Sequence, residues 1–177
     1  MLTRLLTLLL ILVIVVGFSA AADANKYVGV KTCSMCHKAD KTGNQFAIWS
    51  KTAHAEAYKV LTGEKAAAIA KAKDIKNAAE SQECLGCHGQ VDAKLVGAYD
   101  MKDGVQCETC HGAGSAYKTM ATMKDKAKAI AAGLHEFKDA AAIEKFCKTC
   151  HNEKSPTNKE FKFAESWAKI KHAVPKP

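Results

Sequence analysis

The sequence contains four copies of a Cys-x-x-Cys-His pentapeptide. The cysteines are Cys33, Cys36, Cys84, Cys87, Cys107, Cys110, Cys147 and Cys150, and the histidines that follow them are His37, His88, His111 and His151. This spacing is typical of c-type haem attachment, in which two thiols form thioether bonds to the porphyrin and the adjacent imidazole becomes the proximal iron ligand. The chain has 8 cysteines, all within these motifs. We therefore predict four covalently bound haem c groups.

Two other chemistries use paired cysteines. Four Cys-x-x-Cys pairs could form two four-cysteine zinc sites or four redox-active dithiols. Neither chemistry requires a histidine directly after the second cysteine, yet all four pairs have one. The pattern therefore favours haem over zinc and over thiol redox chemistry.

Three further histidines, His54, His135 and His172, lie outside the motifs. An isolated histidine is usually an ordinary surface or core residue, but here four irons each need a sixth ligand, and imidazole binds haem iron well. We predict that all three are distal ligands, which leaves one haem without a histidine partner. Methionine could complete that haem, although methionines more often fill gaps between apolar groups. The methionines considered are Met35, Met101, Met120 and Met123.

The first 24 residues have the layout of a secretory signal peptide. Arg4 precedes an apolar run over residues 5–18, and small residues follow up to Ala24. That run is short for a membrane span of about 20 residues, so cleavage before Asn25 is expected. An uncleaved N-terminal anchor, or peripheral membrane association, is the alternative. We predict a periplasmic protein, with an extracellular location as a second possibility, whose residues 25–177 form one tetrahaem cytochrome c domain.

The expected fold is mainly α: a small helical multihaem cytochrome c domain with long loops. Helical patterns cover residues 44–61, 64–79, 115–132 and 160–174, and Gly63 and Gly133 interrupt them. No stretch has a convincing strand pattern. So short a chain cannot enclose each porphyrin in its own apolar core, so the core must be built around the four haems. The chain without haem should be largely unfolded.

The formal net charge is +8, which could suggest a nucleic-acid partner. The propionates of four haems would add about −8 charges, however, and so offset most of this excess. Arg4 is followed by no other arginine, which argues against a phosphate-binding surface. We predict no nucleic-acid binding, and expect the remaining lysines to steer redox protein partners.

The residues around the motifs resemble the cytochrome c-554 family of tetrahaem cytochromes. The resemblance rests on Lys38 and Ala39 after the first motif, on Trp49 with the Thr-Ala-His-Ala segment at residues 52–55, and on residues 104–112 around the third motif. Phe161-Lys162-Phe163 before His172 matches as well. This chain is shorter than that family leads one to expect.

The resemblance implies three haems with two histidine ligands and one five-coordinate haem. It assigns His54 to the haem of His111 and His172 to the haem of His151. It also gives the first haem, that of His37, a partner from between the third and fourth motifs, where only His135 is available. The haem of His88 would be the five-coordinate one.

We therefore expect an electron carrier of a respiratory chain rather than an enzyme. No carboxylate pair or nucleophile motif argues for a catalytic site. One alternative is a haem enzyme that reduces a small ligand such as nitric oxide at the open haem of His88. Another is a subunit of an extracellular cytochrome filament, in which a neighbouring protomer supplies the missing ligand.

Overall fold

A computed structural model describes residues 25–90 and 99–172, and this part of the chain is helical, as expected. Within it only an isolated bridge at Tyr27 departs from helix, turn and loop. The predicted signal peptide lies outside the described residues. The α-helices are α2 (Val30–His37), α3 (Gln45–Trp49), α4 (Glu64–Ala72), α5 (Gln82–His88), α6 (Cys107–His111), α7 (Met120–Met123), α8 (Lys126–Ala131), α9 (Ala140–Cys147) and α10 (Phe163–Ile170). Short 3-10 helices are η1 (Asp40–Thr42), η2 (Lys59–Thr62), η3 (Ala78–Glu80), η4 (Met101–Asp103) and η5 (Gly114–Ala116).

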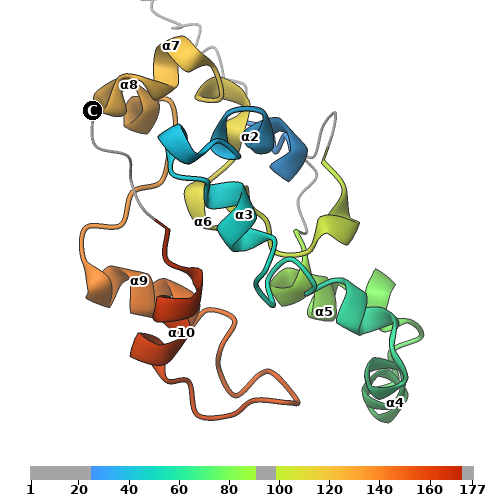
Figure 1. Ribbon diagram of the computed structural model, residues 1–177. Helices are drawn as coiled ribbons and strands as arrows, with labels where there is room; N and C mark the ends of the chain where they lie inside the picture. Colours follow the sequence, from blue (N-terminus) through green and yellow to red (C-terminus); the bar gives the residue numbers. More distant parts are fainter. Residues whose placement is uncertain (1–24, 91–98, 173–177) are drawn as a thin grey trace, which may run out of the picture.

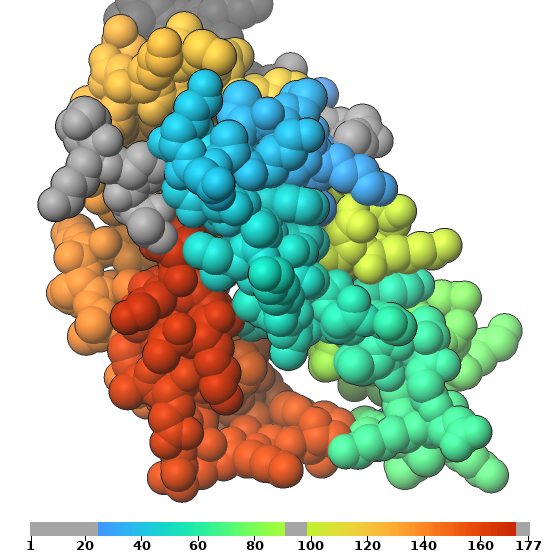
Figure 2. Space-filling view, viewed as in Figure 1, coloured from blue at the N-terminus to red at the C-terminus, as the bar shows by residue number. Residues whose placement is uncertain are grey.

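The helices are short and are spread along an extended molecule. Figure 1 shows α4 at one end and α7 with α8 at the other, with α2, α3 and α6 between them. Helix α2 packs against α3 and α6, and α7 packs against α8. The space-filling view has an opening between the orange C-terminal part and the green segment near α4 (Figure 2). No helix of the described residues is long and apolar enough to cross a membrane.

Several helices end earlier than their sequence patterns predict. The helix expected over residues 64–79 stops at Ala72, where Asp74 adopts a left-handed conformation with φ of 55°. The pattern over residues 115–132 is divided into η5, α7 and α8, because Thr119 and Asp125 each cap a new helix through their side chains. Gly133, with φ of 103°, follows α8, as predicted.

The apolar core is small. One buried cluster contains Leu61, Ala70, Ala78 and Leu85, with Met101 packed against it. Met101 thus has the gap-filling role that methionines most often have. The largest fully buried side chains of the described residues are polar, Gln106 and Glu108. A core of this size leaves much apolar surface to be supplied by another group.

Candidate functional site

The four pentapeptides occupy short helices or helix ends. In the first three motifs the histidine is the last residue of its helix: His37 ends α2, His88 ends α5 and His111 ends α6. In the fourth, Cys147 ends α9 and His151 lies in the following turns. Helical spacing places the two cysteines of a motif on one face, where both can reach one group. All eight cysteines are free of disulfides.

The motifs lie together in two pairs. The thiols of Cys33 in the first motif and Cys107 in the third lie close enough to shift each other's pKa. Likewise, Cys87 in the second motif is hydrogen-bonded to Cys150 in the fourth. The two pairs are themselves close, because the charge of Cys147 in the fourth motif acts on Cys110 in the third. The attachment sites therefore follow one another in the order first, third, fourth, second.

The thiols are poorly suited to redox catalysis on their own. Burial, followed by the charge of Cys147, raises the pKa of Cys110 to about 11. Burial also raises the pKa of Cys147. Reactive dithiols have a lowered thiol pKa, since the thiolate is the nucleophile. Only Cys107, through its interaction with Cys33, has its pKa lowered among the shifted thiols of the described residues.

Three imidazoles are oriented by a hydrogen bond at Nδ1. The Nδ1 of His88 donates to the carbonyl oxygen of Ala57 at 2.7 Å, and that of His135 donates to the carbonyl oxygen of Cys110 at 3.1 Å. The Nδ1 of His37 lies 3.1 Å from Oε1 of Gln45. Metal-ligating histidines almost always make such a bond, which fixes the tautomer and leaves Nε2 available to the metal.

Four imidazoles form two facing pairs. The ring centroids of His54 and His151 are 6.1 Å apart, and those of His111 and His172 are 5.9 Å apart. A ligating imidazole nitrogen lies about 2 Å from its metal, so two rings on opposite sides of one iron have centroids about 6 Å apart. Both pairs therefore fit the spacing of two axial ligands on one haem iron.

These pairs differ from those that the resemblance implies. It assigns His54 to His111 and His172 to His151, whereas the structure places His54 beside His151 and His172 beside His111. His135 forms ring contacts with Phe137 and Phe146, and none of the ring contacts of residues 25–90 and 99–172 joins it to His37.

Burial lowers the pKa of all four of these imidazoles. It lowers the pKa of His54 and of His111, and the neighbouring histidines, His151 and His172 respectively, lower it further. Only a neutral imidazole can ligate a metal, because the ligand must be deprotonated. The lowered pKa of both rings therefore favours the neutral form that a haem iron requires.

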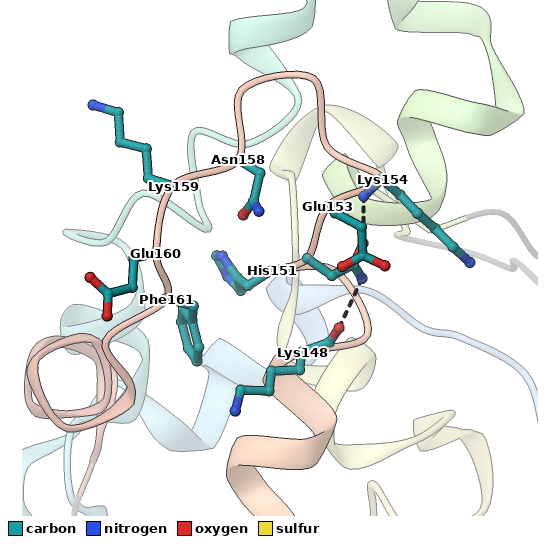
Figure 3. A pocket seen from close by; sticks show the side chains of 9 residues that line it. Lys148, His151, Glu153, Lys154, Asn158, Lys159, Glu160 and Phe161 are labelled. Atoms are coloured by element: carbon teal, nitrogen blue, oxygen red, sulfur yellow. Dashed lines mark hydrogen bonds between the residues drawn. The ribbon is translucent and has the colours of Figure 1, made fainter.

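A cavity of about 490 Å³ lies beside His151. Phe161 stacks on the His151 ring at 4.7 Å and 18° (Figure 3). The remaining lining residues are Lys148, Asn152, Glu153, Lys154, Asn158, Lys159 and Glu160. The imidazole and the aromatic ring offer a flat apolar face, and three lysines against two glutamates leave the lining with a small positive excess, which suits a flat apolar group with anionic substituents. Such a volume is typical of cofactor pockets.

Within the described residues, no three His, Cys, Asp or Glu side chains gather closely enough to hold a bare metal ion. The donors are instead paired across gaps, as axial ligands of a haem are. Paired imidazoles, adjacent thiols and the cavity beside His151 together fit haem c, which requires one cysteine pair and one or two imidazoles per iron.

Residues 104–105 hold the backbone of His54, a feature that sequence reasoning missed. The Val105 N–H donates to the His54 carbonyl oxygen at 2.9 Å, and Trp49 Nε1–H donates to the Val105 carbonyl oxygen at 2.8 Å. Gly104 has φ of 73°, and a Cβ there would collide with the His54 carbonyl oxygen. Trp49 and residues 104–112 stood out in the sequence only as part of the family resemblance, with no sign that they contact His54.

Comparison with known proteins agrees with the resemblance. Residues 32–112 match the family model described as cytochrome c554 and c-prime. A curated relative, cytochrome c-554 of Nitrosomonas europaea, is 37% identical over 110 residues, which cover 58% of this chain and 44% of that protein. The chain thus spans less than half the length of the relative that it matches. No solved structure matches.

Proposed function

Because residues 32–112 match the cytochrome c554 family model and the chain is similar to a cytochrome c-554, we propose that it is an exported tetrahaem cytochrome that carries electrons between redox protein partners of a respiratory chain. Haem iron, when bound, supplies one-electron chemistry by alternating between the ferric and ferrous states. The chain's own part is to attach, ligate and order the haems. The facing imidazole pairs carry the proposal, since they bring together residues far apart in sequence at the spacing of axial ligands.

The ligand sets that we propose follow the structure where it brings rings together. His151 and His54 would hold the fourth haem, and His111 and His172 the third. His37 and His88 are the proximal ligands of the first and second haems. His135 is the remaining imidazole, and the resemblance assigns it to the haem of His37, which leaves the haem of His88 five-coordinate.

Adjacent attachment sites support electron transfer as the function. The first and third motifs touch through their cysteines, as do the second and fourth, and the third and fourth motifs are close. Haems held at these positions would form one continuous series across the molecule. Ligation by two histidines gives lower potentials than ligation by histidine and methionine, so we expect a low-potential carrier.

Export also belongs to the proposal. We propose that residues 1–24 are a signal peptide and that residues 25–177 act in the periplasm, where oxidising conditions and haem attachment to Cys-x-x-Cys-His motifs coincide. The predicted leader pattern and the four Cys-x-x-Cys-His motifs support this location.

The test is to produce the full chain in a bacterium with a haem-attachment system and to measure the intact mass. We expect a periplasmic protein that begins at Asn25 and carries four haems. Replacing both cysteines of one motif by alanine should remove one haem in each of four separate variants. A wild-type protein with bound zinc, or with fewer than four haems in an exported sample, would refute the proposal.

A second candidate function is reduction of nitric oxide at the haem of His88. It is favoured by the ligand count, because three further histidines serve four irons. Stopped-flow mixing of the reduced protein with nitric oxide decides between the two functions. Faster reoxidation of all four haems than in buffer without nitric oxide supports the enzyme, and an equal rate in both supports a carrier. If the protein instead forms filaments, sedimentation will show polymers, and the spectra of these polymers will show that all haems are six-coordinate.

A further inference from the structure

Glu108, inside the third haem motif, is a buried carboxylate with a side chain among the largest that are fully buried. Its Oε1 accepts hydrogen bonds from the N–H groups of Val28 at 2.9 Å and Gly114 at 2.6 Å. Its Oε2 accepts from Gly29 N–H at 2.7 Å. The carboxylate therefore binds the segment that leads into the first motif and the turn that follows the third motif.

Only N–H donors surround this carboxylate. Every hydrogen bond described for its oxygens comes from a backbone N–H, so both oxygens act as acceptors, as carboxylate oxygens do. None of the six ion pairs of the described residues includes Glu108. Among the described residues the carboxylate is therefore stabilised by peptide dipoles, and a charge buried in this way acts strongly on its surroundings.

The field of this charge reaches two attachment sites. The pKa of Cys33 is raised by its interaction with Cys107 and by burial. The charge of Glu108 raises it further. Burial and then Glu108 raise the pKa of Tyr117. Cys33 and Cys107 lie side by side next to Glu108, and they belong to the first and third motifs.

We propose that Glu108 sets the potential of the haems on the first and third motifs, because its buried charge lowers their reduction potentials relative to the other two. This inference rests on the proposed function. Reduction adds an electron to each iron, and a fixed negative charge nearby opposes that addition. Local charge and burial are among the means by which a protein tunes a haem. Glu108 thus acts on the two haems through its charge and through the backbone that it binds, without ligating an iron.

The test compares three variants of the exported holoprotein in a potentiometric titration with dithionite, followed optically and by the resolved haem methyl resonances. Glu108→Gln keeps the shape and removes the charge, whereas Glu108→Asp keeps the charge and shortens the reach. Gln106→Ala is the matched neutral control. Gln106 is equally buried, accepts from Val30 N–H at 2.7 Å and donates to the Asp100 carbonyl oxygen at 2.7 Å, so it binds the same segment without charge.

We expect Glu108→Gln to favour reduction of two of the four haems about tenfold, which is about 59 mV for a one-electron couple. Glu108→Asp should keep those two potentials near the wild-type values. Gln106→Ala should lower the denaturation midpoint and leave all four potentials in place.

Two results would overturn the inference. One is that Glu108→Gln carries four haems with unchanged potentials. The other is that Gln106→Ala or Glu108→Asp moves the same two potentials as far as Glu108→Gln, since geometry rather than charge would then be the cause. If Glu108→Gln fails to fold, Gln106→Glu decides: it adds a second carboxylate to the same segment and should lower the same two potentials, and no change would again overturn the inference. A wild-type protein without four haems would refute the proposed function first.

Discussion

The imidazole rings of His54 and His151 face each other at 6.1 Å, although the second and third haem motifs lie between them in the sequence. His111 and His172 form the corresponding pair at 5.9 Å. Each of these two irons would thus be held by ligands from distant segments of the chain. Ligation would therefore tie those segments together and stabilise the fold.

The first prediction tests these pairs with doubled substitutions. Removing the fourth haem with Cys147→Ala and Cys150→Ala deletes the iron that we assign to His54. Adding His54→Ala to that variant should then create no new high-spin haem, because the ligand has lost its iron already. In the otherwise wild-type protein, His54→Ala should create one. Low-temperature electron paramagnetic resonance, together with the optical high-spin band, measures the number of high-spin haems in each variant.

The control repeats this design at the other pair. Cys107→Ala with Cys110→Ala removes the third haem, and adding His172→Ala should again leave the number of high-spin haems unchanged. A new high-spin haem in either combined variant would restore the pairing that the family resemblance implies.

The second prediction concerns Gly104, which adopts φ of 73° and ψ of −143°, a region that only glycine enters easily. Gly104→Ala should cost about 3 kcal/mol of unfolding free energy, because backbone strain adds to a collision with the His54 carbonyl oxygen. It should also weaken axial ligation by His54. Denaturant titration and the high-spin fraction measure the two effects.

Gly63→Ala is the matched control for Gly104. Gly63 has an extended conformation, with φ of −90°, and its added Cβ would make only ordinary contact at 3.6 Å with the Val60 carbonyl oxygen. Its cost should stay within about 1 kcal/mol. Equal losses at the two glycines would contradict the role given to Gly104.

The third prediction is a loss of stability in mild acid. Burial lowers the pKa of His54 and His111 in the folded chain, so the unfolded chain binds more protons as the pH falls below about 6.5. The stabilisation is therefore present above that pH and is lost as the pH falls towards the lowered values. Ligation acts in the same direction, since protons compete with iron for the imidazoles. Denaturant midpoints at constant ionic strength should be lower at pH 5 than at pH 7.5; equal midpoints would refute the prediction.

The fourth prediction concerns the chain without haem. A variant with all eight cysteines replaced by alanine should show no cooperative thermal transition, because the buried apolar cluster around Leu61 and Leu85 is too small to stabilise the fold. Calorimetry measures this directly. A variant lacking only the fourth pair of cysteines is the control and should keep a cooperative transition at a lower temperature.

The helical class and the resemblance to the cytochrome c-554 family could be predicted from sequence because they depend on local spacing; the candidate haem-binding residues stay a prediction. The pairings of His54 and His172 that we propose could not be predicted in this way, since several irons compete for each imidazole and the three-dimensional path of the chain selects among them. The end of α4 was predicted too late because alanines and lysines favour helix well beyond Ala72. Glu108 was missed because a charged residue between two cysteines reads as exposed.

The position of Asn25 beside the end of α8 bears on how the molecule would be oriented at a membrane. Its Nδ2 donates to the Ala132 carbonyl oxygen at 2.7 Å and lies against Gly133, just after α8. Any leader that remained attached would therefore join the molecule at the end formed by α7 and α8 (Figure 1). In that case the end with α7 and α8 would face the membrane. Helix α4, at the opposite end, and α5 with His88 would face away from the membrane, where a redox partner could bind.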